Sequence, residues 1–464
     1  MKYVSTRGRA PVLGFEDTVL AGMAEDGGLY VPDAWPRFSR PGIADLAGLD
    51  YPKLAARVMA PFVGEALDGQ ELASMIADSY AGFDDRQITP LRPLADNEWL
   101  LELFHGPTLA FKDLALQFLG RLFDHILAKR DARITVIGAT SGDTGSAAIE
   151  ACRDRDRMMV FMLHPHGRVS EVQRRQMTTV DAANVRNIAI DGTFDDCQAL
   201  VKALFADTDL RARLHPAAVN SINWARIMAQ VVYYFFAALK LGAPERRTLF
   251  SVPTGNFGDV FAGYVATRLG LPVAGLVVAT NRNDILDRVL KTGAYRLGPV
   301  QPTLSPSMDI QVSSNFERLL FDLYDRDGAR VTALMADLKR EGAFTLSEDA
   351  LARARALFSS RRVDEDETVA MIARTHGECG VLIDPHTAVG RAAGLALRTD
   401  PALALVTLAT AHPAKFGDAV ERATGISPGL PARLAEVLAK PERCRRLAND
   451  FNVVRRYIME QAGA

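Results

Sequence analysis

Residues 101–113 read Leu101-Glu102-Leu103-Phe104-His105-Gly106-Pro107-Thr108-Leu109-Ala110-Phe111-Lys112-Asp113. This pattern predicts an apolar strand, a Gly-Pro turn and the start of an apolar helix, with a lysine at the helix start. Apolar neighbours leave Lys112 poorly solvated, and desolvation disfavours the ammonium form. A partly neutral lysine can attack a carbonyl carbon and form a Schiff base. A lone lysine at a helix start is more often a residue that reaches for solvent, so the hypothesis depends on its surroundings.

Two glycine-rich loops supply those surroundings. Loop 138–146 follows a predicted strand at 134–137, and loop 253–259 lies between a predicted strand at 248–252 and a predicted helix at 260–269. Each places backbone amides at a helix start, where anions bind. Neither matches the Walker pattern or a clean GxGxxG, and each alone could be an ordinary βα turn. Together with a desolvated lysine, the two loops predict one phosphorylated cofactor and one anionic substrate.

The composition is that of an ordinary soluble globular protein. The 464 residues are 48% hydrophobic and 24% charged, and the net charge of −2 gives no basic footprint for nucleic acid or acidic membranes. The four cysteines are scattered without a CxxC pair, so neither a metal site nor a disulfide framework is expected. The first residues contain no long apolar run, which predicts no signal peptide or membrane span. A cytoplasmic enzyme is the simplest interpretation.

Short β-rich runs alternate with amphipathic helices from residue 98 onward. This alternation predicts βαβ units and a parallel sheet covered by helices on both faces. Strands are expected at 99–104, 134–138, 158–163, 185–190, 217–220, 248–252, 275–279 and 403–408, and helices at 114–129, 172–177, 197–205 and 225–241. Ligands bind at the carboxyl ends of such strands. All three segments described above lie there, which favours one shared site.

Four segments describe the predicted domain organisation. Residues 1–95 form an N-terminal helical domain, and 96–464 form the catalytic core. Within the core, the charged, helix-prone stretch 299–373 is interpreted as an insertion that closes over it, and 432–461 as an amphipathic helical tail with a basic turn at 443–446.

Several separated motifs, in order along the chain, resemble the threonine synthase family, and specifically its bacterial and fungal branch with a long N-terminal extension. They comprise the lysine motif and both loops, together with Met-Lys-Tyr-Val-Ser-Thr-Arg-Gly (1–8), Asp-Gly-Gly-Leu-Tyr-Val-Pro (26–32), Asn-Ser-Ile-Asn-Trp-Ala-Arg (220–226) and Thr-Ala-His-Pro-Ala-Lys-Phe (410–416). The resemblance runs essentially end to end. It implies the tryptophan synthase β-like, fold type II architecture of pyridoxal-phosphate enzymes, with parallel sheets flanked by helices and an extra N-terminal helical domain.

The resemblance also implies roles for individual residues. Lys112 would hold pyridoxal 5′-phosphate and, once released, act as a base; Thr410 would be the hydroxyl partner of the pyridine nitrogen. The cofactor phosphate would bind the turn made by Gly255, Asn256, Phe257, Gly258 and Asp259.

The substrate is expected to bind the first loop and the start of helix 225–241. The expected residues are Thr140, Ser141, Gly142, Asp143, Thr144, Gly145 and Ser146, together with Asn223 and Arg226. Arg226 is the candidate for the substrate phosphate. Asp143 departs from the wider superfamily, which has an asparagine there that contacts the cofactor's 3′-oxygen, so Asp143 is expected to orient the loop instead. Structural or orienting roles are expected for His105, Asp113, His412 and the segment 384–390.

The function implied is conversion of O-phospho-L-homoserine and water to L-threonine and phosphate, the last step of threonine biosynthesis. Alternatives on the same scaffold are an O-phosphohomoserine phospho-lyase or a threonine or serine dehydratase. An alternative of another class is a non-catalytic pyridoxal-phosphate binder. The sequence leaves open whether the protein is a monomer or a homodimer.

Overall fold

The computed structural model describes residues 1–140 and 142–463. Its larger sheet has six strands, and the four neighbour pairs from β13 to β4 are parallel, whereas β3 is antiparallel to β4. The strand order is β13 (Phe358–Arg362), β10 (Val273–Thr280), β9 (Thr248–Pro253), β14 (Ala404–Ala409), β4 (Glu98–Glu102) and β3 (Leu91–Ala95).

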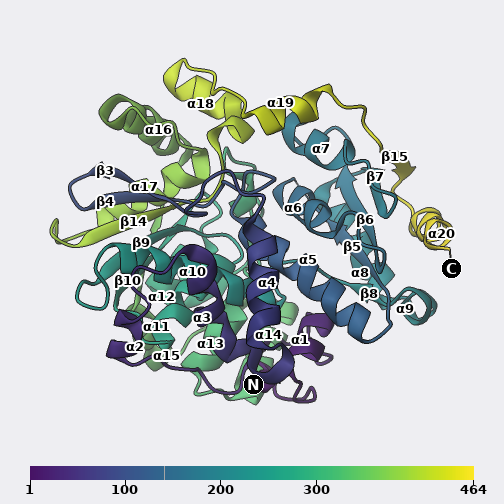
Figure 1. Ribbon diagram of the computed structural model, residues 1–464, viewed down its shortest axis with the longest axis horizontal. Coiled ribbons are helices and arrows are strands. Elements are labelled where there is room, and N and C mark those ends of the chain that lie inside the picture. Colours follow the sequence, from purple (N-terminus) through teal and green to yellow (C-terminus); the bar gives the residue numbers. More distant parts are fainter. Residues whose placement is uncertain (141, 464) are drawn as a thin grey trace.

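The second sheet has five strands, all parallel to their neighbours. Its order is β15 (Arg445–Ala448), β7 (Val185–Asp191), β6 (Met158–Pro165), β5 (Ile134–Ala139) and β8 (Pro216–Ala217). The two sheets lie on opposite sides of the molecule, with helices between and around them (Figure 1). The expected parallel α/β architecture is confirmed.

Apolar residues on every side explain why the central elements are buried. All six residues of β9 and all six of β14 are buried, as expected for strands covered on both faces. Helix α10 (Trp224–Lys240) is buried from Trp224 to Ala238, the pattern of a helix enclosed by protein rather than lying on the surface. It packs against α5 (Lys112–Lys129), α11 (Gly258–Arg268) and α3 (Tyr51–Val63), whereas α17 (Pro385–Leu397) packs on β9, β10 and β14.

The N-terminal helices complete this core. Helix α3 lies on α10, and α4 (Gly69–Tyr80) lies on α5. The remaining N-terminal elements are β1 (Tyr3–Ser5), which pairs with β2 (Tyr30–Pro32), together with α1 (Phe15–Ala21), α2 (Arg40–Ala44) and η1 (Gly64–Ala66). Because β3 joins the large sheet, the last residues of 1–95 are shared with the core; the two-domain division stays an interpretation.

The structure corrects the prediction for the tail. Residues 432–461 are not one helix: α19 (Ala432–Ala439) ends before Pro441, the basic segment forms strand β15 on β7, and α20 (Phe451–Ala462) follows. Proline cannot continue a helix interior, and an exposed edge strand tolerates arginines. In Figure 1 this segment crosses from the large sheet's side of the molecule to the second sheet.

The interpretation of 299–373 as an insertion is also incomplete, because this stretch supplies β13, the edge strand of the large sheet. Its other elements are η2 (Pro306–Met308), α13 (Phe316–Leu323), α14 (Gly328–Glu341), β12 (Ala343–Thr345), which pairs with β11 (Ala294–Arg296), α15 (Glu348–Arg355) and the start of α16 (Glu365–Cys379). The elements not yet named are α6 (Asp143–Cys152), α7 (Glu171–Thr178), α8 (Phe194–Ala206), α9 (Thr208–Leu214), α12 (Ile285–Thr292), η3 (Pro413–Phe416) and α18 (Gly417–Thr424). Among the described helices, none is long and apolar enough to cross a membrane.

Candidate active site

Lys112 begins α5 and is buried, with 8% of its surface exposed. The turn before it is attached to the end of β14, because the amide of Phe111 donates to the carbonyl of Thr410 at 2.9 Å. The Asp113 carboxylate closes the turn by accepting from the amide and the hydroxyl of Thr108, both at 2.7 Å. The turn before Lys112 is thus bonded to Thr410 through Phe111, and the contacts of Asp113 are structural.

Asp143 lies directly opposite Lys112. Its Oδ2 is 3.2 Å from the Lys112 ammonium, and its Oδ1 is 2.8 Å from the ammonium of Lys415. Gln173 donates to the same Oδ1 at 2.9 Å. A single buried carboxylate therefore bridges two lysines, a role more specific than the predicted orientation of the loop.

These contacts change the ionisation of the groups. Burial lowers the pKa of Lys112; Asp143 opposes this, whereas the charges of Lys415 and Arg226 add to it. Burial alone would raise the pKa of Asp143, but Lys112 and Lys415 outweigh it and hold that pKa well below its usual range. Lys112 therefore releases its proton more easily than an ordinary lysine, which is what a base near neutral pH requires.

Loop 140–146 is held together largely by its own groups. The hydroxyl oxygen of Thr140 accepts from the amides of Gly142 at 3.0 Å and Gly145 at 2.9 Å. The Ser146 hydroxyl donates to the Asp143 carbonyl at 3.1 Å, and Thr144 is half-buried. The predicted contact of Ser141 with substrate falls on a residue outside the described part of the chain. Among the described residues of the loop, Asp143 is the one that contacts Lys112.

Loop 253–259 has the opposite character. No side chain of the described residues caps the start of α11, where Phe257 has a positive φ of 60°. The loop is held from outside: Ser313 donates to the Gly255 carbonyl, and Asn315 donates to the Asn256 carbonyl at 3.2 Å. Its helix-start amides thus form an open anion site.

Gly255 packs against the backbone of residues 307–308, which leaves no room for a Cβ. A Cβ there would lie 2.9 Å from the Ser307 carbonyl oxygen and 3.1 Å from the Met308 Cα. The Ser307 hydroxyl also approaches Asp143 Oδ2 at 3.5 Å. Ser307 therefore connects the anion loop with the carboxylate that binds Lys112, so the three predicted segments do form one site.

Asp259 is buried behind this anion loop. It accepts hydrogen bonds from the hydroxyls of Tyr233 at 2.5 Å and Tyr234 at 2.9 Å. Burial raises the pKa of Asp259 to about 6 although both tyrosines oppose the shift. With that pKa the carboxyl is still mostly ionised at neutral pH, and the two tyrosines hold it behind the loop.

Arg226 is a buried cation near Lys112. Its Nη1 donates to the Val219 carbonyl at 3.2 Å, its Nε has no partner among the described residues, and no carboxylate of these residues forms an ion pair with it. Burial lowers the pKa of Arg226 to about 10, so it stays charged at neutral pH. A buried unpaired cation is costly unless an anion binds it.

Asn223 has a different environment. Its side-chain oxygen caps α10 by accepting from the amide of Ala225 at 3.1 Å, and its nitrogen donates to the Val19 carbonyl at 2.8 Å. These contacts attach the N-terminal segment to the start of α10. The predicted contact with substrate remains a prediction, but it competes with two structural bonds.

Lys415 is a buried site residue to which sequence reasoning gave no role. Lys415 lies in Ala-Lys-Phe, whose flanking alanine and phenylalanine also precede Lys112, and this shared apolar context was the available signal. The His386 Nδ1 lies 2.6 Å from Asp384, and its Nε2 accepts from the Ser307 amide at 3.2 Å. The segment 384–390 thus supports Ser307, in agreement with its expected scaffolding role. His412 accepts from the Ala414 amide, which is also structural.

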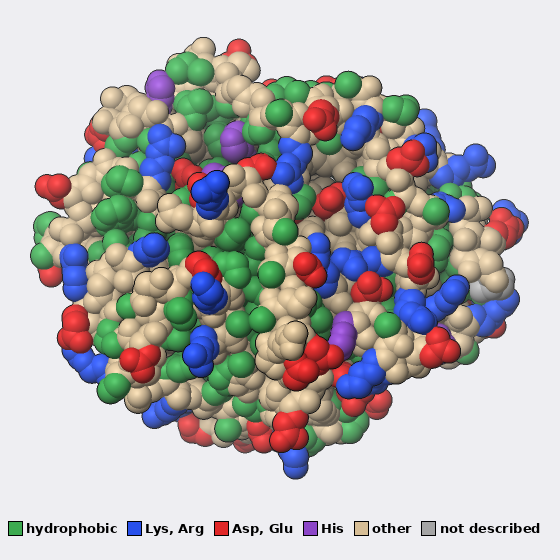
Figure 2. Space-filling view, viewed as in Figure 1, with side chains coloured by type: hydrophobic (Ala, Val, Ile, Leu, Met, Phe, Trp, Pro, Cys, Tyr) green, Lys and Arg blue, Asp and Glu red, His purple; other side chains and the backbone are tan. Residues whose placement is uncertain are grey.

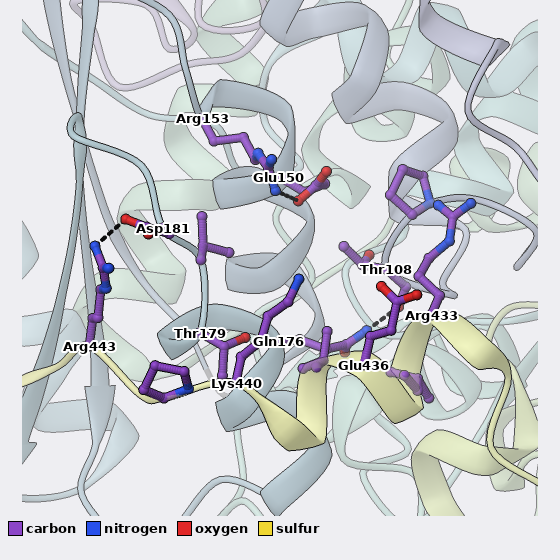
Figure 3. Close-up of a pocket in the computed structure, with 15 residues that line it drawn as sticks. Thr108, Glu150, Arg153, Gln176, Thr179, Asp181, Arg433, Glu436, Lys440 and Arg443 are labelled. Atoms are coloured by element: carbon purple, nitrogen blue, oxygen red, sulfur yellow. Dashed lines mark hydrogen bonds and ion pairs between the residues drawn. The ribbon is translucent and has the colours of Figure 1, made fainter.

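A surface groove borders this site at Thr108 and Gln176 but does not include Lys112 or Asp143. Its volume is about 500 Å³, and residues of α6, the end of α7 and α19 line it (Figure 3). Its charges are compensated within the groove: Arg153 pairs with Glu150, and Arg443 with Asp181. Lysines and arginines are likewise interspersed with acidic residues over the face shown in Figure 2. The groove is lined by four basic and three acidic side chains, and three of the four basic ones are ion-paired, so it offers little free positive charge for a phosphate ester.

Known protein families match this arrangement along most of the chain. The model described as threonine synthase N terminus matches residues 2–80, that of pyridoxal-phosphate dependent enzymes matches 84–337, and that of threonine synthase, C-terminal, matches 387–458. The threonine synthase of Pseudomonas aeruginosa is 54% identical over 99% of this chain and 98% of its own length. The chain belongs to the threonine synthase family. The resemblance seen in the sequence is confirmed.

Solved structures of threonine synthases have the same fold. The PLP-bound threonine synthase of Brucella melitensis superposes with a TM-score of 0.97 at 52% identity, covering 100% of both chains. The yeast threonine synthase has a TM-score of 0.94 at 39% identity, covering 100% of this chain and 99% of the other. The fold type II assignment and the pyridoxal-phosphate cofactor are therefore confirmed.

The residues present fit this cofactor. A buried lysine of lowered pKa suits its aldehyde, and the uncapped helix start at 255–258 suits its phosphate. The individual assignments of Lys112, the 255–259 turn and Thr410 stay predictions that this geometry supports.

Proposed function

We propose that this member of the threonine synthase family converts O-phospho-L-homoserine and water to L-threonine and phosphate at the Lys112 site. The observation that carries the proposal is the combination of a buried lysine of lowered pKa with two separate anion sites. These are the uncapped start of α11 and the unpaired guanidinium of Arg226. One accommodates the cofactor phosphate, and the other an anionic group of the substrate.

Lys112 both holds the cofactor and moves protons. When bound, pyridoxal phosphate withdraws electrons from the substrate's α-carbon. Once the substrate amine has displaced it, the Lys112 amine takes the α-proton and then a β-proton while phosphate leaves the γ-carbon. A proton is then delivered to the γ-carbon, and water adds with its hydroxyl at the β-carbon while a proton returns to the α-carbon, which gives threonine. Lys112 serves these repeated transfers because its lowered pKa keeps the amine neutral for part of the time.

Arg226 is proposed to hold the substrate phosphate. Arg226 lies in the first turn of α10. Its neighbours Ile227 and Ser221 face Gly258 in the anion loop, since each has a carbon 3.7 Å from the position of a Cβ at Gly258. Its Nε is free to donate, and an anion there would offset the cost of the buried charge. Loop 140–146 is proposed to hold the substrate carboxylate.

Product identity separates this reaction from the alternatives. Incubation with O-phospho-L-homoserine should release phosphate and threonine in equal amounts, with little 2-oxobutyrate, and free L-homoserine should not react because it lacks the leaving group. Mainly 2-oxobutyrate would indicate the phospho-lyase. A dehydratase would act on threonine or serine directly, and a binding protein would turn over none of these substrates.

Attachment of the cofactor can be tested independently. Borohydride reduction followed by peptide mapping should place the pyridoxyl group on Lys112, and Lys112→Ala should abolish turnover without loss of the fold. An adduct on Lys415 instead would exchange the roles of the two lysines.

Arg226→Ala should weaken use of the phosphorylated substrate by about 2–5 kcal/mol if the contact is a buried, charge-assisted one. Cofactor absorbance should change little. Unaltered kinetics would disprove the phosphate assignment but leave the reaction in place.

Location and assembly complete the proposal. An enzyme of amino-acid biosynthesis whose four cysteines are all free fits the cytoplasm. Sedimentation would distinguish a monomer from a homodimer.

A further inference from the structure

Lys415 is the second lysine of the site. It lies in η3, directly after β14, and its side chain is completely buried. Its ammonium donates to the Thr108 carbonyl at 2.7 Å and contacts Asp143 Oδ1 at 2.8 Å. The same Thr108 carbonyl accepts from Gln176 at 3.0 Å, the bond drawn in Figure 3. Lys415 is therefore held on one side by the turn before Lys112 and on the other by Asp143.

The charges around Lys112 make this arrangement unusual for a structural lysine. Asp143 from α6 is the negative group within ion-pair distance of Lys112, and Lys415 from η3 shares that carboxylate. Arg226 from α10 adds a second nearby positive charge. The carboxyls of Asp113, on α5 itself, and of Asp259, from α11, form no ion pair with Lys112 among the described residues; burial raises the pKa of each to about 6, so both are still mostly ionised at neutral pH. Within ion-pair distance of Asp143, two ammonium groups therefore share one carboxylate.

We propose that Lys415 is a positioning residue of the reaction: it binds Asp143, so that this carboxylate does not form an ion pair with Lys112 alone. The inference rests on the proposed role of Lys112 as the base. Asp143 paired only with Lys112 would stabilise the ammonium form and keep the base protonated. When Asp143 pairs with both lysines, it still fixes the Lys112 side chain but stabilises the ammonium form of Lys112 less.

The pH dependence of turnover tests this directly. The acidic limb of the kcat profile reports the protonation of the base in the substrate complex. Lys415→Met removes the competing cation without changing the length of the side chain greatly, so the limb should move upward by about one to three pH units. Lys415→Arg keeps the charge and should leave the limb near its wild-type position. Lys291→Met, which removes an ion-paired lysine of α12 far along the chain, should not move it.

A second measurement does not depend on turnover. Cofactor-free protein is mixed with pyridoxal phosphate over a series of pH values and reduced with borohydride, and peptide mass spectrometry then gives the labelled fraction of Lys112. The midpoint for Lys415→Met should rise in parallel with the kinetic limb, because attachment also requires the neutral amine. Labelling of wild-type Lys112 in the same series tests the proposed function separately.

Asp143→Asn supplies the opposite change, since it removes the anion and leaves Lys415. Its labelling midpoint should fall below that of the wild type, and the double variant Lys415→Met, Asp143→Asn should lie between the two single variants. This order keeps the proposal testable if Lys415→Met alone is too unstable to study. A midpoint in Lys415→Met equal to the wild type, with only KM raised, would overturn the proposal and make Lys415 a substrate-binding residue.

Discussion

Loops 140–146 and 253–259 look alike in the sequence but are built differently. Both follow a central strand, contain several glycines and carry an aspartate in the first turn of a helix. In the first loop, Thr140 satisfies two of the loop's own amides, and the aspartate projects between two lysines. In the second, the helix-start amides stay open, and the aspartate turns back toward two tyrosines. One loop therefore acts through a charged side chain and the other through its backbone.

Exchanging each aspartate for asparagine gives the largest expected contrast. Asp143→Asn leaves two buried ammonium groups without their anion, and breaking such a buried pair costs about 3–5 kcal/mol. Asp259→Asn keeps an oxygen that accepts from the tyrosines, so the loss should be near 1 kcal/mol, the usual contribution of one hydrogen bond. Urea unfolding of the cofactor-free variants measures both. Equal losses would mean that the two aspartates do not differ as described.

Substitution of Gly255 in loop 253–259 should have an intermediate effect. Gly255→Ala brings a Cβ to 2.9 Å from the Ser307 carbonyl oxygen, so the loop must shift. Overpacking of this kind costs about 1–3 kcal/mol, and we expect the affinity for pyridoxal phosphate to fall by about 5- to 150-fold. Gly82→Ala is the matched control, because no atom lies within 4 Å of its Cβ. If cofactor titration gives the same Kd for both variants, Gly255 is not part of the site that binds the cofactor phosphate.

Removing the hydrogen bonds that the Thr140 hydroxyl accepts within the first loop should have the smallest effect. Thr140→Val keeps the shape of the side chain but removes the oxygen that accepts from the amides of Gly142 and Gly145. The expected cost is about 1–2 kcal/mol, because the buried Gly142 amide loses its acceptor whereas the Gly145 amide keeps a second bond, to the Gly142 carbonyl at 3.1 Å. Thr144→Val is the control, since among the described residues no hydrogen bond of its hydroxyl is recorded. A stability loss in the control as large as in Thr140→Val would contradict the internal role of Thr140.

Sequence reasoning located the segments of the site correctly because they follow buried strands. Strands such as β9 and β14 are short runs of apolar residues bounded by glycine, proline or polar residues, and in a parallel sheet their carboxyl ends meet at one edge. In the two large sheets, three strands were not expected from the sequence, and all of them, β3, β13 and β15, lie at sheet edges. An edge strand buries few side chains, so its residues carry little hydrophobic signal. The arginine-containing strand β15 therefore looked like part of a helical tail.

The sequence by itself determined the parallel α/β fold, the buried Lys112 and the two anion loops, because each depends on local apolar patterning and on glycine. Only the tertiary structure decided which charges meet. Lys415 is 303 residues from Lys112, and Arg226 has no carboxylate beside it among the described residues, yet both affect the same amine. The strength of a charge pair depends on distance and burial, and neither quantity can be read from positions along a chain. The two-lysine bridge at Asp143 is therefore a property of the folded protein alone.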